Sequence, residues 1–198
     1  MTDKIKTFIK GYRYKSIKTE RLLLIKPNLK YIDEYILMLS DKRMWKYDSL
    51  GKPLTKKNLS KFFKNRIKDW RKQRGFYFLI IYNNKLIGSV ATNWINYISK
   101  KTEICYEIAY PYWNKGFGTE AVSAYLDWIY SNTYLNRIEA GYAAPNIGSK
   151  RILVKTGFKK EGIKRDSAIY NGKTYDDYIY ALLRKDWVKR KKRKNVIK

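Results

Sequence analysis

Two glycines between a strand-like and a helix-like segment constrain the fold of this chain more than any other feature. Residues 102–109 are rich in β-branched and aromatic side chains, and residues 121–130 place apolar side chains at helical spacing. Gly116 and Gly118 lie between them, and glycine lets the backbone approach a ligand closely and adopt dihedral angles that a Cβ would forbid. At the start of such a helix, free backbone N–H groups and the positive end of the helix dipole converge. The order therefore predicts an anion site, and the alternative is a glycine turn that only begins a helix.

Length and composition indicate a single globular domain. A chain of 198 residues is long enough for one well-buried α/β domain and too short for two. Its hydrophobic content of 44% argues against disorder. No apolar run approaches the roughly 18 residues of a membrane span, and residues 1–18 lack the apolar core of a secretion signal. We therefore expect a soluble, cytoplasmic protein without a membrane partner, and the sequence leaves monomer and homodimer open.

The residue types that are missing limit the chemistry. The chain has no histidine and one cysteine, Cys105, which excludes disulfide frameworks, His-bearing triads and the usual zinc sites. We expect no metal, and any proton transfer must use Glu, Asp, Tyr, Lys, Ser or water. Cys105 lies in mid-strand with no histidine to activate it, so we expect a small buried hydrophobic residue.

The charge is strongly positive. The formal net charge is +27, from 44 Lys and Arg against 17 Asp and Glu, and residues 189–194 form an uninterrupted basic run. Such a surface attracts anions, so contact with RNA or the ribosome is one interpretation. The other is an AT-rich coding composition, which is favoured because the excess is spread along the whole chain. We expect the terminal run to be a solvated tail.

The hydrophobic patterns predict a mixed sheet with helices on both faces. Asn28 and Thr55 are typical helix caps, Asn83-Asn84 suits a two-residue hairpin turn, and Gly157 suits a left-handed helix end. Strands are predicted at 19–25, 76–82, 85–92, 103–109, 137–144, from 158 onward and at 174–183. Helices are predicted at 28–39, 55–70, 117–130 and 149–156.

Several motifs together resemble those of one family. The run from Tyr110 to Ala121 looks like the acetyl-CoA pyrophosphate loop of the GNAT N-acetyltransferases, and residues 146–158 resemble their second motif. Residues 19–24, 86–89 and 171–187 are similar to the ribosomal-protein N-terminal acetyltransferase branch (RimJ/RimL-like). The resemblance implies a central mixed, mostly antiparallel sheet of about seven strands, with a splayed pair of parallel strands. It also implies a basic lead-in at 1–18, an acetyltransferase domain at 19–188 and a basic C-terminal tail at 189–198.

The resemblance implies acetyl-CoA as acetyl donor. Its pantetheine arm would lie between the strand carrying 106–109 and the strand carrying 139–143. Backbone groups left unpaired by the splay at Ile108 and Ala109 would bond the arm, and Asn146 matches a position that contacts it. Asn146 could instead only cap the short helix. The pyrophosphate loop would consist of Trp113, Asn114, Lys115, Gly116, Phe117, Gly118 and Thr119.

The sequence departs from the family pattern at positions that bear on mechanism. Trp113 stands where the family usually has Arg or Gln, Leu153 where many members have a tyrosine acid, and Gly141 where others have a glutamate base. Ser149 matches a serine that acts on the departing thiolate in some ribosomal-protein acetyltransferases. Its alternative role is to cap or pack the helix.

Glu107 is the best candidate for a general base. It lies on the splayed strand, where it could take a proton directly or through water. The alternative interpretation is that Glu107 is only a solvent-facing or ion-paired strand residue. Asp177 aligns with an acidic residue of the branch, and we expect it to be structural. An α-amine with a pKa near 8 reaches the site partly neutral, whereas the neutral fraction of a lysine with a pKa near 10.4 is about 250 times smaller. A site without an established base therefore suits an N-terminal α-amine, or a similarly weak amine, better than a lysine.

Other functions remain open at this stage. Polyamines, amino sugars, aminoglycosides and aminoacyl-tRNA are alternative acceptors, although +27 charges repel polycations unless Asp33, Glu34, Asp41 and Asp48 form an acidic pocket. A non-catalytic nucleic-acid-binding module on the same fold is the alternative from another class. Residues 45–47 and 12–15, which interleave aromatic and basic side chains, could stack on bases.

Overall fold

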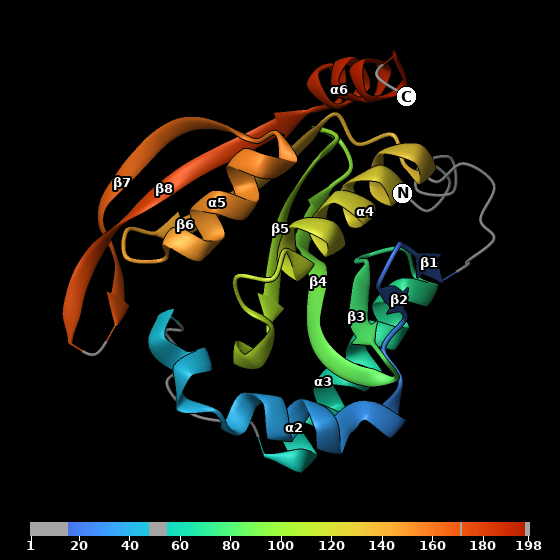
Figure 1. Cartoon of the computed structure of the whole chain (residues 1–198), viewed down its shortest axis with the longest axis vertical. Coiled ribbons are helices and arrows are strands. Elements are labelled where there is room, and N and C mark those ends of the chain that lie inside the picture. The colour runs from blue at the N-terminus through green and yellow to red at the C-terminus, as the bar shows by residue number, and fades with distance from the viewer. Residues whose placement is uncertain (1–15, 48–54, 171, 197–198) are drawn as a thin grey trace.

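The strands of the described residues form one eight-stranded sheet. The computed structural model describes residues 16–47, 55–170 and 172–196. Along the sheet the order is β1-β2-β3-β4-β5-β6-β8-β7 (Figure 1). The strands are β1 Ile17–Lys18, β2 Leu23–Ile25, β3 Tyr77–Tyr82, β4 Lys85–Asn96, β5 Lys101–Ile108, β6 Arg137–Ala143, β7 Lys159–Tyr170 and β8 Lys173–Leu183. The α-helices are α2 Ile32–Ser40, α3 Lys56–Arg71, α4 Phe117–Asn132, α5 Ile147–Thr156 and α6 Arg184–Val196, and short 3₁₀ turns cover 29–31, 42–47 and 110–112.

Strands β5 and β6 are the parallel pair of an otherwise antiparallel sheet. Their pairing covers only Lys101 with Arg137, Thr102 with Ile138 and Glu103 with Glu139. Beyond these pairs β5 continues to pair with β4, up to Ile108, and β6 continues to pair with β8, up to Ala143. The two strands therefore diverge, which confirms the predicted splayed parallel pair.

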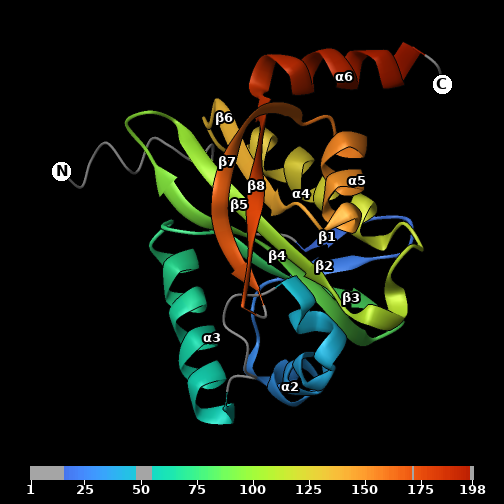
Figure 2. The same cartoon turned by 90° about the vertical axis from the view of Figure 1, so that its left-hand side faces the viewer.

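Helices cover both faces, as predicted. Helix α4 packs on one face and helices α2 and α3 on the other (Figures 1 and 2). Strand β3 shows the alternation, because Phe78 and Ile80 join the core under α4, whereas Leu79 and Ile81 join the core under α2 and α3. None of the described helices is both long and apolar enough to cross a bilayer.

The local turn and cap signals are confirmed. Asn28 and Thr55 cap their helices through side-chain oxygens that accept from the N–H groups of Lys30 and Asn58. Asn83 and Asn84 both have positive φ, 47° and 60°, the conformation that a two-residue hairpin turn needs. These features depend on neighbours in sequence, so a single sequence reveals them.

The predicted strand at 19–25 is wrong in part. Strands β1 and β2 pair with each other, Ile17 with Leu24, and a turn separates them. The Thr19 N–H donates to the Leu22 carbonyl at 2.9 Å, and the Thr19 hydroxyl accepts from the Leu22 N–H at 2.8 Å. A threonine hydroxyl that bonds nearby backbone offers an alternative to strand pairing, and here it turns the chain.

Cys105 is exposed, not buried as predicted. Ile104 and Ile108 of β5 point into the core under α4. Because side chains alternate along a strand, Cys105 points to the opposite face.

The C-terminal basic run is part of a helix, and Lys189, Lys192 and Arg193 on it are exposed to solvent. Helix α6 runs across residue 188, where the sequence predicts the domain to end, and lies across one end of the molecule (Figure 2). The Arg184 guanidinium donates to the carbonyls of Tyr130, Thr133 and Leu135 at 2.6–2.8 Å. These carbonyls lie at and just after the C-terminal end of α4, where no intrahelical N–H is available to them. Arg184 thus caps a helix that ends about fifty residues before it.

Gly88 sets the distance between β4 and β5 beside the candidate base. A Cβ at this position would lie 2.2 Å from the carbonyl oxygen of Glu107 and 3.1 Å from the Cα of Ile108. Both atoms belong to backbone, which can move only if the strand moves. Any side chain at Gly88 therefore pushes the two strands apart.

Replacing Gly88 by alanine is expected to lower the free energy of unfolding by about 1–3 kcal/mol, the usual cost of overpacking a filled site. Gly162→Ala on β7 is the matched control, because its Cβ would meet no atom within 4 Å. Urea unfolding of both variants measures the difference. A Gly88→Ala protein as stable as Gly162→Ala would contradict this account.

Candidate active site

The glycine turn opens the N-terminal end of α4. Gly116 is the residue before the helix, with φ of 82° and no side-chain cap, and Asn114 is also left-handed with φ of 58°. The first intrahelical bond runs from the Glu120 N–H to the Gly116 carbonyl at 3.0 Å. The N–H groups of Phe117, Gly118 and Thr119 precede it and have no intrahelical partner. Together with the helix dipole they form the anion-binding geometry expected from the sequence.

Gly118 is required for its lack of a side chain and not for its dihedral angles. Its φ is not positive, which differs from the expectation for both glycines. A Cβ there would lie 2.6 Å from Cδ1 of Ile152 on α5. Gly118 therefore lets α4 and α5 approach each other, and of the two glycines only Gly116 has the left-handed conformation.

Arg21, in the turn between β1 and β2, bonds the glycine loop and the first turn of α4. Its Nε donates to Glu120 Oε2 at 2.7 Å, its Nη1 donates to the Lys115 carbonyl at 3.1 Å, and its guanidinium lies 4.3 Å from the centre of the Phe117 ring. The Thr19 hydroxyl donates to Glu120 Oε1 at 2.6 Å. Burial opposes ionisation of Glu120, but these bonds hold its pKa below the ordinary value. Residues 19–24 were recognisable as a motif in the sequence, but the contact of Thr19 and Arg21 with Glu120 was not.

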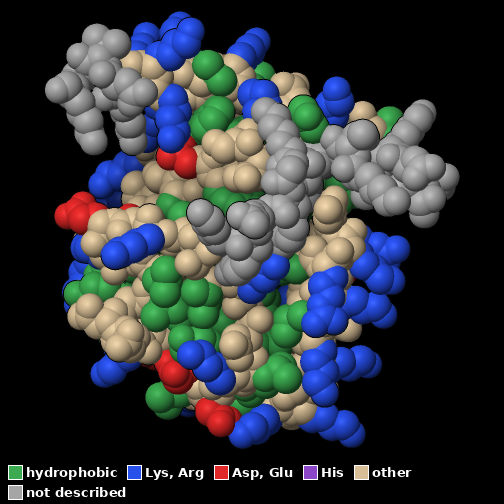
Figure 3. All heavy atoms as spheres, turned by 90° about the vertical axis from the view of Figure 1, so that its right-hand side faces the viewer, with side chains coloured by type: hydrophobic (Ala, Val, Ile, Leu, Met, Phe, Trp, Pro, Cys, Tyr) green, Lys and Arg blue, Asp and Glu red, His purple; other side chains and the backbone are tan. Residues whose placement is uncertain are grey.

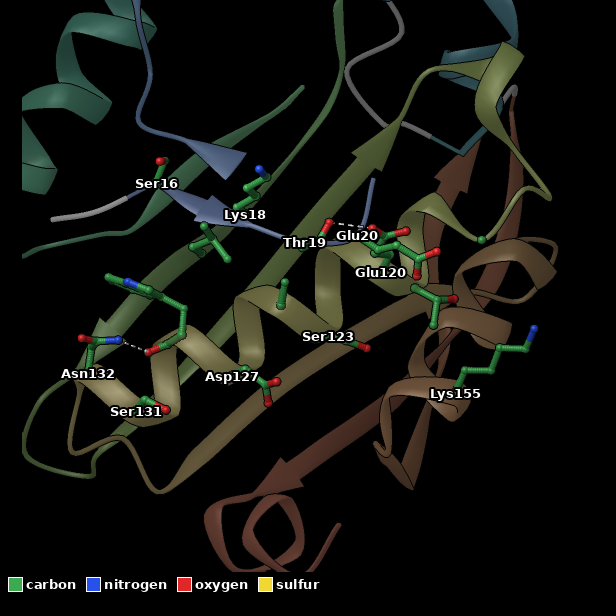
Figure 4. A pocket seen from close by; sticks show the side chains of 15 residues that line it. Ser16, Lys18, Thr19, Glu20, Glu120, Ser123, Asp127, Ser131, Asn132 and Lys155 are labelled. Carbon is green, nitrogen blue, oxygen red and sulfur yellow. Dashed lines mark hydrogen bonds between the residues drawn. The ribbon is translucent and has the colours of Figure 1, made fainter. Parts of the chain in front are cut away.

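A polar groove of about 960 Å³ begins at the same helix end. It runs along α4, past Ser123, Asp127 and Ser131, which follow one another four residues apart (Figure 4). Thr19 and Glu20 line it from the β1–β2 turn, and Lys155 lines it from α5. The groove thus continues from the amides of the glycine turn along the outer face of α4.

In the gap between β5 and β6, Ile108 is the residue whose backbone groups point toward β6. The Ala109 N–H donates to the Ile87 carbonyl at 2.8 Å, so Ala109 bonds β4, and antiparallel alternation turns Ile108 away from β4. The Ala109 carbonyl accepts from the Tyr112 N–H at 2.9 Å. The expectation of unpaired groups at Ala109 is therefore wrong. The Ile108 carbonyl accepts from the indole N–H of Trp113, so the expectation of an unpaired carbonyl at Ile108 is wrong as well.

Tyr106 and Ser149 meet across the gap. Ser149 lies in the first turn of α5, where the Asn146 side chain caps the helix by accepting from the Ser149 N–H at 3.0 Å. The Ser149 hydroxyl lies 2.8 Å from the Tyr106 hydroxyl, which also reaches the Ser149 carbonyl at 3.2 Å. Burial raises the pKa of Tyr106 above its ordinary value, so the phenol stays protonated. The sequence missed Tyr106 because the contact joins residues 43 positions apart.

Glu107 lies on the opposite face of β5, in a cluster of hydroxyl groups. Its Oε1 accepts from the Ser89 hydroxyl at 2.8 Å and from the Tyr35 hydroxyl, and the Tyr35 and Tyr77 hydroxyls lie 2.6 Å apart. Tyr35, Tyr77 and Ser89 are buried, whereas Glu107 is partly exposed. Burial, and then the charge of Glu107, raises the pKa of both tyrosines well above the ordinary value. Both tyrosines therefore remain neutral, and the hydroxyls of Tyr35 and Ser89 orient one carboxylate oxygen.

Of the remaining predicted residues, Lys115 and Trp113 make contacts within the glycine loop, and Asp177 lies on β8. The Lys115 ammonium group donates to the Pro111 carbonyl at 2.8 Å, and Trp113 packs against Tyr110 with ring centres 5.1 Å apart. Asp177 on β8 pairs with Ala143 of β6 and Lys164 of β7. The side chains of residues 45–47 and all of 12–15 lie outside the described part of the chain.

Comparisons with known proteins agree with this geometry. The family model described as "Acetyltransferase (GNAT) domain" matches residues 21–159. The protein named "Uncharacterized N-acetyltransferase p20" of Bacillus licheniformis is 30% identical over 175 residues, covering 87% of this chain and 98% of that protein. The "[Ribosomal protein uS5]-alanine N-acetyltransferase" of Escherichia coli is 32% identical over 126 residues, 61% of this chain and 64% of that protein.

A solved structure shows the same fold. RimL, a ribosomal L7/L12 α-N-protein acetyltransferase solved in complex with coenzyme A, superposes with a TM-score of 0.79 at 17% identity, covering 85% of this chain and 98% of that one. The match to the family model spans the splayed strands, the glycine turn and α5. The chain belongs to the GNAT family of acetyltransferases, with acetyl-CoA as the acetyl donor.

Proposed function

We propose that this enzyme acetylates the N-terminal α-amine of a protein by direct attack of that amine on the thioester. The observation that carries the proposal is the Glu107 cluster, a partly exposed carboxylate held by two buried hydroxyls on the face of β5 opposite Ser149. The relatives named as ribosomal-protein acetyltransferases support a protein acceptor. No covalent enzyme intermediate is needed.

The residues that would hold the donor fit its chemistry. Free amides of Phe117, Gly118 and Thr119 at the start of α4 suit a diphosphate, and the loop residues Trp113 to Gly116 would shape that site. Ile108 faces the gap between the strands, where it and Asn146 would contact the pantetheine arm, with Ala109 beside them. Acetyl-CoA supplies an activated acetyl thioester when bound.

Glu107 would remove the proton of the attacking amine, directly or through water. One of its oxygens is fixed by Ser89 and Tyr35, so the carboxylate has a defined direction without losing its charge. Neutral amine is the reactive form, and an α-amine with a pKa near 8 is already partly neutral at pH 7. A single carboxylate that accepts hydrogen bonds therefore suits an α-amine better than a lysine.

Ser149 would give a proton to the departing thiolate and take one back from solvent water, and Tyr106 would position it. When the Tyr106 hydroxyl donates to the Ser149 oxygen, the Ser149 hydroxyl hydrogen is available to another acceptor. This pair would replace the tyrosine acid that many family members carry at the position of Leu153. Leu153 is fully buried and has no polar group.

The structure disfavours polyamines as acceptors. The acidic side chains that could form a polycation pocket are engaged separately. Asp33 pairs with Lys56 at 2.6 Å, Asp41 pairs with Arg43 at 2.6 Å, and Glu34 accepts from the Leu86 N–H at 2.8 Å. Asp48 lies outside the described residues.

Replacing Glu107 by glutamine is expected to lower kcat/KM for an N-terminal peptide by about 10²-fold or more, the range of general base catalysis. The deficit should shrink as the pH rises past the pKa of the amine, because more amine then arrives neutral. Glu103→Gln is the matched control, since Glu103 lies on the same strand face and bonds Asn93 and Trp94 instead. Equal rates for both variants across the pH range would exclude Glu107 as the base.

A screen of acceptors tests the substrate class. N-terminal peptides, a peptide with an internal lysine, spermidine, an aminoglycoside, an amino sugar and an aminoacyl-tRNA are offered with acetyl-CoA, and thiol release is followed. We expect the highest kcat/KM with a free N-terminal α-amine. A higher value for any of the other acceptors would overturn the proposal.

The Tyr106 and Ser149 pair is testable by a double-mutant cycle. We expect Ser149→Ala to lower kcat by about 10²-fold and Tyr106→Phe to lower it less. Adding Tyr106→Phe to Ser149→Ala should then cost little more, because Tyr106 acts through Ser149. Thermal stabilisation by acetyl-CoA should be unchanged in all three variants. Losses that add in full would show that the two hydroxyls act independently.

A further inference from the structure

We propose that the exposed face of α3 is a docking surface for RNA. Lys57, Lys61, Lys64, Lys68 and Arg71 follow one another three or four residues apart, which places them on one line along the helix. All five side chains are exposed. At 1.5 Å per residue the line is about 21 Å long. We call these five residues the α3 stripe.

The charges of the α3 stripe are not neutralised within the described part of the chain. None of the five makes an ion pair with a described residue. The other basic residues of the helix do, because Arg66 pairs with Asp69 at 3.0 Å and Lys56 pairs with Asp33 at 2.6 Å. Asp69 is also the only acidic residue of α3. The stripe therefore presents continuous positive charge.

The packing of α3 on the sheet does not require the basic residues of the α3 stripe. The opposite face of α3 buries Leu59, Phe63 and Trp70 against the sheet, and these contacts hold the helix in place. Like charges three or four residues apart repel each other along a helix, so the stripe weakens α3 on its own. A polyanion that lies along the helix would relieve this repulsion at every position, whereas one small anion could reach only part of the line.

Nucleic acid suits the stripe better than a membrane does. A helix that binds a membrane surface inserts an apolar face into the lipid, but the apolar face of α3 lies against the sheet. Among the described residues of α3, no large hydrophobic side chain is exposed. Figure 3 shows the result as a column of Lys and Arg side chains along the edge where α3 lies.

The helix that carries the stripe contacts the Glu107 cluster with its other, buried face. Phe63 of α3 contacts Tyr35 and Tyr77, with ring centres 5.3 and 6.4 Å apart, and these tyrosines belong to the Glu107 cluster. RNA bound along α3 would therefore be separated from the proposed acceptor face by one helix diameter, roughly 10 Å, a distance that an attached protein chain can span. This last consequence rests on the proposed function, whereas RNA binding itself does not.

The test measures binding of a fluorescently labelled RNA duplex to the full chain by anisotropy at several salt concentrations. One variant carries Lys57→Gln, Lys61→Gln, Lys64→Gln and Lys68→Gln. The matched control carries Lys185→Gln, Lys189→Gln, Lys192→Gln and Arg193→Gln on α6, at residues that are also exposed. Glutamine and lysine have similar helix propensities, and both variants lose four positive charges.

We expect the α3 variant to bind the duplex at least about tenfold more weakly, and its slope of log K against log salt to fall by three to four units, since each phosphate contact contributes about 0.9. The α6 variant should keep most of its affinity. Both should keep thermal stabilisation by acetyl-CoA and the wild-type rate on a free peptide. Equal losses in both variants, unchanged binding by the α3 variant, or binding to phosphatidylserine vesicles without binding to RNA would overturn the proposal.

Discussion

The separation of β5 from β6 is the constraint on which the rest of the structure depends. The pairing of β5 with β6 ends after three residue pairs. Beyond that point β5 pairs only with β4, and β6 pairs only with β8. The opening is stable because contacts beside it reconnect the halves. Gly118 lets α4 approach Ile152 of α5, and the Tyr106 and Ser149 hydroxyls meet across the gap. A gap in the middle of a sheet thus becomes a fixed feature of the fold.

Strand alternation then divides the chemistry between two faces. Tyr106 and Glu107 are neighbours in sequence, yet one reaches Ser149 on α5 and the other reaches Tyr35 on α2. The candidate proton donor and the candidate base therefore approach the same stretch of β5 from opposite sides. In the proposed mechanism, the substrate amine and the thioester would reach this stretch of β5 from different faces.

The sequence predicted those parts of the fold that depend on near neighbours. Asn83-Asn84, Gly116 and the caps at Asn28 and Thr55 occur where expected, because each satisfies a backbone requirement within a few residues. Contacts between distant residues could not be predicted. Arg21 reaches Glu120 across 99 positions, and Tyr35 reaches Glu107 across 72. The backbone partners of Ala109 depended on the register between β4 and β5, which periodicity does not reveal.

The pairing of Arg21 with Glu120 also sets the electrostatic balance at the mouth of α4. The helix dipole stabilises a carboxylate in the first turn, but an unpaired carboxylate would repel a diphosphate at the same place. The guanidinium cancels that charge at a distance of 2.7 Å, so the uncharged amides remain free to attract an anion. The helix start is thereby stabilised without adding negative charge at the proposed diphosphate site.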